Sequence, residues 1–106
     1  MNASVDAEGK TIYWHRELPP IDAEPIGEHV VEATSGRVPD TIAHREELWD
    51  RGKDALMAQT RKRLADEIAR LGGRYAHIVH ESIDTRHDAS TSEAWLQGRF
   101  VYTLYR

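Results

Sequence analysis

The sequence predicts an α+β domain, with a mostly antiparallel four-stranded sheet and one long helix packed on one face. Two observations predict it. Residues 93–105 alternate between apolar and polar side chains, which is typical of a strand with one buried face. Residues 40–71 repeat apolar side chains every three or four positions, which is typical of a helix with one buried stripe. The elements follow the order strand, strand, helix, strand, strand, which favours this class.

Each predicted strand ends at a turn signal or a polar segment. The first strand covers 11–18 and ends before Pro19-Pro20, because proline cannot donate a hydrogen bond to a sheet. The second covers 28–35 and ends at a glycine. The third and fourth cover 74–84 and 93–105, and the polar stretch between them predicts a hairpin with a long loop.

The helix is bounded by residues that suit its two ends. Asp40 or Thr41 can cap its start, and Gly72-Gly73 is a strong signal for its end. Gly52 lies on the buried stripe, so it either allows a close approach to the sheet or divides the segment into two helices. The stripe consists of Leu48, Trp49, Gly52, Leu56, Thr60, Leu64, Ile68 and Leu71.

Length and composition predict one domain in a reducing environment. The chain has 106 residues, which we divide into a flexible tail at 1–10 and a single domain at 11–106. It has no cysteine, so disulfides, thiolate metal sites and thiol nucleophiles are excluded. We find no signal peptide and no segment that suits a membrane span, and we therefore expect a cytoplasmic protein without a membrane partner.

The charge balance argues against a nucleic-acid partner. There are 18 acidic and 14 basic residues, for a formal net charge of -4. An acidic surface does not attract a phosphate backbone. The sequence also lacks a glycine-rich phosphate loop and a nucleophile elbow, so we expect no cofactor.

The sheet face away from the helix is predicted to carry apolar side chains. If Ile12 and Phe100 meet the helix, alternation turns a second set of residues the other way. A patch of several hundred Å² usually has a partner, which favours a homo-oligomer or a bound small molecule. Alternatively, the sheet curls on itself or bulges exchange its faces. The residues of this predicted interface are Tyr13, Trp95, Val101 and Tyr105.

Six histidines are many for this length, and they suggest a second class of function. A histidine and a carboxylate on neighbouring strands can act as base and acid in a small hydrolase or isomerase. The candidate catalytic residues are His15, His29, His77, His80 and Glu81.

The same region contains weak candidates for a metal site. His77, His80 and His87 are potential ligands for zinc or a similar ion. In a regular strand, however, residues three apart point to opposite faces, so His77 and His80 can share an ion only if the strand is bulged. We therefore expect no bound metal.

The leading hypothesis is a non-enzymatic binding or assembly module that forms a homo-oligomer through its sheet face. The alternatives are the small acid–base enzyme and the histidine metal site. The absence of a catalytic motif favours the first.

Overall fold

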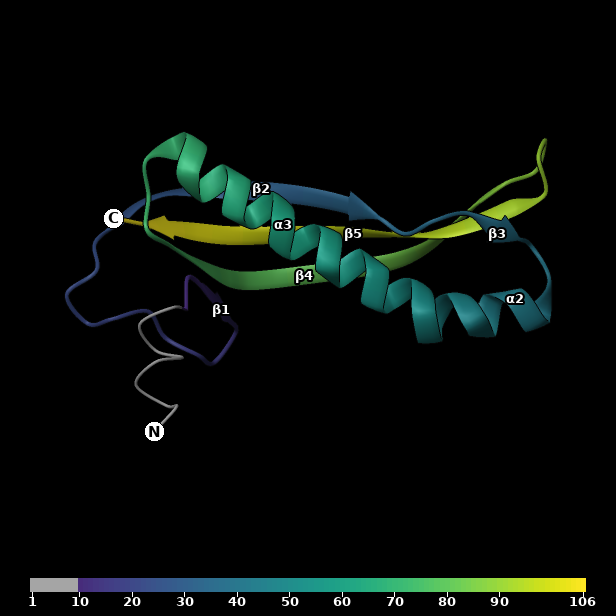
Figure 1. Cartoon of the computed structure of the whole chain (residues 1–106), viewed down its shortest axis with the longest axis horizontal. Helices are drawn as coiled ribbons and strands as arrows, with labels where there is room; N and C mark the ends of the chain where they lie inside the picture. Colours follow the sequence, from purple (N-terminus) through teal and green to yellow (C-terminus); the bar gives the residue numbers. More distant parts are fainter. Residues whose placement is uncertain (1–9) are drawn as a thin grey trace.

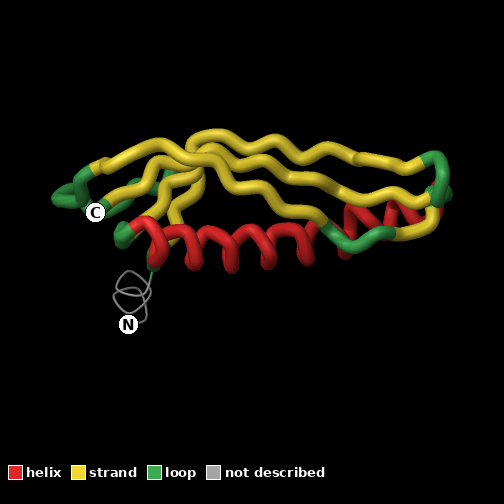
Figure 2. The backbone as a smooth tube through the Cα atoms, turned by 90° about the horizontal axis from the view of Figure 1, so that it is seen from above, coloured by secondary structure: helices red, strands yellow, loops and turns green. Residues whose placement is uncertain are grey.

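The computed structural model describes residues 10–106, which form one sheet with the helices on one side (Figures 1 and 2). The predicted tail at 1–10 lies outside the described residues except for Lys10. The elements are β1 (Ile12–Trp14), β2 (Pro25–Thr34), β3 (Val38–Pro39), α2 (Ile42–Glu47), the π-helical segment η1 (Leu48–Gly52), α3 (Lys53–Leu71), β4 (Tyr75–Asp88) and β5 (Glu93–Tyr105).

The sheet has five strands and mixed direction. Its order is β1-β4-β5-β2, and the two-residue β3 pairs with β5 beyond the end of β2. β1 is parallel to β4, and the other pairs are antiparallel. The α+β class and the long helix are thus confirmed, whereas the expected number of strands is corrected from four to five, with one parallel pair among antiparallel ones. β3 is too short to give an alternating pattern that the sequence could reveal.

Three strands differ in length from the prediction. β2 spans Pro25–Thr34 and so begins three residues before the predicted range of 28–35. β1 ends at Trp14 because His15 adopts a left-handed backbone conformation, with φ of 51°. β4 continues to Asp88 through residues predicted as loop, so the hairpin connection is short. The Asp88 carboxylate accepts hydrogen bonds from the N–H and the hydroxyl of Ser90, at 2.9 and 2.6 Å, which stabilise this tight turn.

The helical segment begins and ends as predicted. The Thr41 hydroxyl accepts a hydrogen bond from the His44 N–H at 3.3 Å, and Gly72 ends α3 with a left-handed φ of 75°. The helical segment is not broken at Gly52, because the π-helical turn η1 connects α2 to α3 there. A Cβ atom on Gly52 would lie 2.8 Å from Leu48 Cδ1, so a larger residue would force the buried Leu48 side chain to move. Trp49 is exposed, and its predicted place in the stripe is wrong.

The core lies between α3 and the face of β5 that the alternation predicts. Phe100 and Tyr102 of β5 are fully buried, as are Leu56 and Leu64 of α3. Trp14 packs edge-to-face on Phe100, with ring centroids 6.1 Å apart. These contacts attach the helix and β1 to the centre of the sheet.

The close contact of α3 with the sheet predicts the effect of a single methyl group. A Cβ on Gly98 would lie 2.7 Å from Phe100 Cε1 and 3.3 Å from Leu56 Cδ2. We expect Gly98→Ala to lower the free energy of unfolding by about 1–3 kcal/mol, because it overpacks the core. Urea denaturation measures this. Gly36→Ala is the matched control, since nothing lies within 4 Å of its added Cβ. Equal stabilities of the two variants would contradict the packing.

Candidate functional site

The sheet face turned away from α3, which we call the open face, is the main candidate site. Figure 2 shows the helices on the other side of the sheet only. Alternate residues of three neighbouring strands form this face. In rows across β2, β5 and β4, they are Glu28, Thr103 and His77; Val30, Val101 and His80; Glu32, Arg99 and Ser82; and Thr34, Gln97 and Asp84.

A β-bulge in β4 adds an apolar residue to this face. The pairing register shifts between Ile78 and His80, so that Val79 and His80 together oppose Val101. Val79 is 44% exposed, and Val30 on the other side of β5 is 42% exposed. Val30, Val101 and Val79 form a band across the three strands, which we call the valine row.

The predicted interface residues are placed in different ways. Val101 lies at the centre of the valine row. Tyr105 is half-buried at the end of β5, opposite Tyr75 at the start of β4. Trp95 is covered by Arg37, whose guanidinium carbon lies 4.1 Å from the ring centroid. Tyr13 is buried against Tyr75, with ring centroids 5.9 Å apart. The expectation that Tyr13 is available to a partner is therefore corrected, because Tyr75 of the same chain covers it.

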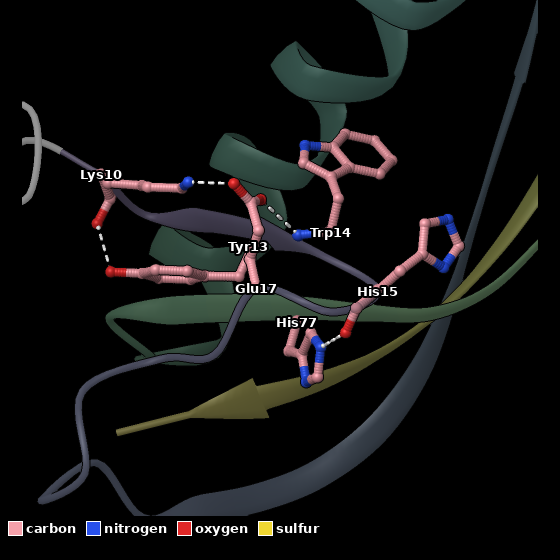
Figure 3. A network of polar contacts seen from close by, with 6 residues as sticks. All are labelled: Lys10, Tyr13, Trp14, His15, Glu17 and His77. Atoms are coloured by element: carbon pink, nitrogen blue, oxygen red, sulfur yellow. Dashed lines mark hydrogen bonds and ion pairs between the residues drawn. The ribbon is translucent and has the colours of Figure 1, made fainter.

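The edge of the sheet at β1 holds two of the predicted histidines in one network (Figure 3). The His15 N–H donates to the Ile78 carbonyl at 2.8 Å, and His15 Nε2 lies 2.6 Å from Glu81 Oε1. His77 Nε2 donates to the His15 carbonyl at 2.7 Å. A carbonyl only accepts, so this nitrogen of His77 carries a proton. The network holds the turn after β1 against β4.

A second part of the network fixes the turn from the other side. The Glu17 carboxylate accepts a hydrogen bond from the Trp14 N–H at 2.8 Å and pairs with Lys10 (Figure 3). The Lys10 hydrogen bond and then the Trp14 N–H hold the pKa of Glu17 below its ordinary value. Glu17 thus closes the turn that begins at His15.

The His15–Glu81 pair has the groups of an acid–base site but not its surroundings. The carboxylate binds Nε2, which leaves Nδ1 available for proton transfer. The two side chains are 44% and 34% exposed, at the β1 edge of the sheet. A cavity of about 590 Å³ lies instead at the opposite edge, between β2 and α3, and includes Glu32, Arg63 and Glu67 in its lining. The pair and this cavity cannot form one catalytic site.

The remaining histidines are separate from the network. His29 lies at the β2 edge, with its ring centroid 5.7 Å from that of Tyr102. Burial, and then the charge of Glu67, raise the pKa of Tyr102 to about 12, so its hydroxyl is neutral at ordinary pH. His87 lies near the hairpin end, with Nδ1 4.0 Å from Asp40 Oδ2.

The bulge turns His77 and His80 to the same face, as a shared metal ion would require. Nevertheless, within residues 10–106 no three histidine, cysteine, aspartate or glutamate side chains are grouped closely enough to hold a metal ion. His87 opposes Ala94, far along the strand from the other two histidines. The described residues therefore offer an incomplete ligand set.

Sequence reasoning missed Val79 and Arg37. Val79 was hidden because regular alternation was assumed along β4. One signal was available: Ile78 and Ile83 are five positions apart, so both can face the helix only if the strand contains an extra residue. Arg37 gave no signal, because its contact with Trp95 depends on the loop that leads to β3.

The chain was compared with family models, with curated proteins and with solved structures, and none of them matches it. In the part of the chain that the structure describes, no helix has the length and apolar character to cross a membrane.

The lowered pKa of Glu17 predicts how the β1 turn responds to pH. A depressed carboxyl pKa stabilises the fold above the ordinary value of 4.5, and this contribution disappears as the pH falls through the lowered value. Glu17→Gln is expected to be less stable than the parent protein at neutral pH, and the difference is expected to shrink as the pH falls below 4.5. Urea denaturation at neutral pH and at successively lower pH values tests this. Glu46→Gln, on α2, is the control, and an equal loss for both variants would contradict the assignment.

Proposed function

We propose that the protein is a non-enzymatic assembly module that pairs with a second copy through its open face. The observation that carries the proposal is the valine row. Val30 and Val79 flank Val101 on either side of the central strand, so the apolar band is nearly symmetric about β5. A surface of this kind can pack against its own copy, as a two-fold interface requires.

The layer structure of the protomer supports this proposal. The helices cover one face of the sheet, and the described chain provides no second layer for the other face (Figure 2). The Cα radius of gyration is 16.1 Å, compared with about 13 Å for a compact domain of this length. A second copy would supply the missing layer and bury the apolar row.

The dimensions of the open face also suit a dimer. β2 has 10 residues, β5 has 13 and β4 has 14. About ten paired residues on three strands give a footprint of roughly 34 by 14 Å, or about 500 Å² per copy. The two faces together give about 1,000 Å², which is at the lower limit of the area buried in a specific interface.

The enzyme alternative has one observation in its favour, the 2.6 Å contact between His15 and Glu81. Its surroundings weigh against it, because both side chains are partly exposed at a sheet edge. Their hydrogen bonds have a sufficient structural role in fixing β1 to β4. The assembly proposal explains more of the molecule.

Light scattering behind a sizing column tests the proposal. The expected mass is twice 12.1 kDa or a higher multiple. Val30→Lys is expected to weaken the association at least about tenfold, because each dimer would lose two buried valines and gain two buried charges. Ile42→Lys is the matched control. Ile42 is 83% exposed on α2, away from the open face, so its replacement should leave the mass unchanged.

A monomer at all accessible concentrations would contradict the proposal. So would an equal effect of Val30→Lys and Ile42→Lys on the association. Circular dichroism establishes that both variants remain folded, so that a lost dimer is distinguished from a lost fold.

A further inference from the structure

Two arrangements of a dimer are compatible with the valine row, and this inference about them rests on the proposed function. Packed sheets keep their strands within about 30° of each other, so the two-fold axis runs either along β5 or across it. An axis along β5 lays β2 over β4 of the second copy. An axis across β5 at Val101 lays β2 over β2 of the second copy.

The two outer strands of the open face carry different chemistry. On either side of the valine row, β2 carries the carboxylates Glu28 and Glu32. β4 carries His77 in the row of Glu28 and His80 in the valine row, whereas Ser82 lies in the row of Glu32 and Asp84 one row further along. Next to the valine row, β2 therefore presents carboxylates and β4 presents imidazoles, which can donate hydrogen bonds to carboxylates.

These charges distinguish the two axes. With the axis along β5, Glu28 faces His77 of the second copy and Glu32 lies diagonally across from its His80. With the axis across β5, Glu28 faces Glu32 of the second copy, and the contact occurs twice. Like charges placed across an interface are unfavourable, whereas carboxylate and imidazole are complementary.

Arg99 is the main group that the favoured arrangement brings close to its own copy. It lies on β5, near the axis, and each Arg99 is directly opposite Glu32 of its own protomer. It is also exposed, so its long side chain can extend sideways toward that carboxylate. The neighbouring acid offsets the meeting of the two guanidinium groups.

We propose that the two-fold axis of the dimer runs along β5, so that the acidic strand β2 of each copy lies over the histidine-bearing strand β4 of the other. The two β5 strands then run in the same direction. Every residue of the open face on β5 lies close to its own counterpart, whereas an axis across β5 brings only Val101 close to itself.

The absence of cysteine from the chain makes this prediction directly testable. Single variants Val101→Cys and Gln97→Cys are treated with a short bis-maleimide cross-linker. Gln97 lies four residues from Val101. The two copies of residue 97 are about 10 Å apart if the axis runs along β5, but about 25–30 Å apart if it crosses β5. Lys62→Cys, on the outer side of α3, is the control without an expected cross-link.

The outcomes separate this inference from the proposed function. Cross-linked dimers of both the Val101 and the Gln97 variants support the axis along β5. A cross-link at 101 without one at 97 overturns it and leaves the dimer through the open face intact. A mixture of Arg99→Cys and Thr103→Cys would then cross-link, because the other axis brings these two positions together. No cross-link at either 101 or 97 overturns both proposals.

A substitution that removes one charge tests the axis independently, because the two axes predict opposite changes in the dissociation constant of the dimer. Glu28→Gln is expected to weaken dimerisation about two- to fivefold, because it removes the carboxylate that faces His77 of the second copy. With the axis across β5 the same variant would strengthen dimerisation, because it removes the repulsion from Glu32. Glu46→Gln is the control, and sedimentation velocity measures the dissociation constants. Stronger association of Glu28→Gln would overturn the inference.

Discussion

The packing of α3 against β5 is the contact on which the rest of the structure depends. β5 pairs with β2, β3 and β4, so its inner side chains determine where the whole sheet meets the helix. Phe100 and Tyr102 are completely buried there, and Gly98 lets Leu56 approach the strand closely. Because alternate residues point to opposite faces, burial of this set also fixes which residues of β5 remain on the open face. The packing of α3 against one face of β5 thus determines both the core and the candidate interface.

The bulge in β4 determines which residues of this neighbouring strand face the helix and which lie on the open face. Ala76 and Ile78 precede the bulge and Ile83 follows it, yet all three pack toward α3. Without the extra residue, Ile83 would point away from the helix and the far half of β4 would lose its contact with the core. The same extra residue turns Val79 outward next to His80. The valine row on this otherwise polar face is therefore partly a consequence of the bulge that keeps the core continuous.

The sequence was sufficient for the parts of the fold that local patterns determine. The alternation of residues 93–105 predicted β5, and Thr41 and Gly72 predicted the two ends of the helical segment. The remainder depends on contacts between distant residues. β1 is parallel to β4 because the helical path returns the chain to the end of the sheet where it began, which no local pattern shows. Among the candidate residues, the alternation placed Val101 on the open face, but it could not show that Tyr75 covers Tyr13.

The proposed dimer offers a role for two of the histidines, His77 and His80. The hydrogen bonds of His15 and His77 hold the turn after β1 against β4. These two histidines are therefore poorly suited to catalysis at an exposed edge. His77 and His80 nevertheless share the open face, opposite the side that carries Glu28 and Glu32. This arrangement would disfavour a dimer in which β2 lies over β2 of the second copy. It would favour a dimer in which β2 lies over β4 of the second copy. In the proposed dimer, His77 and His80 would orient the interface and have no catalytic role.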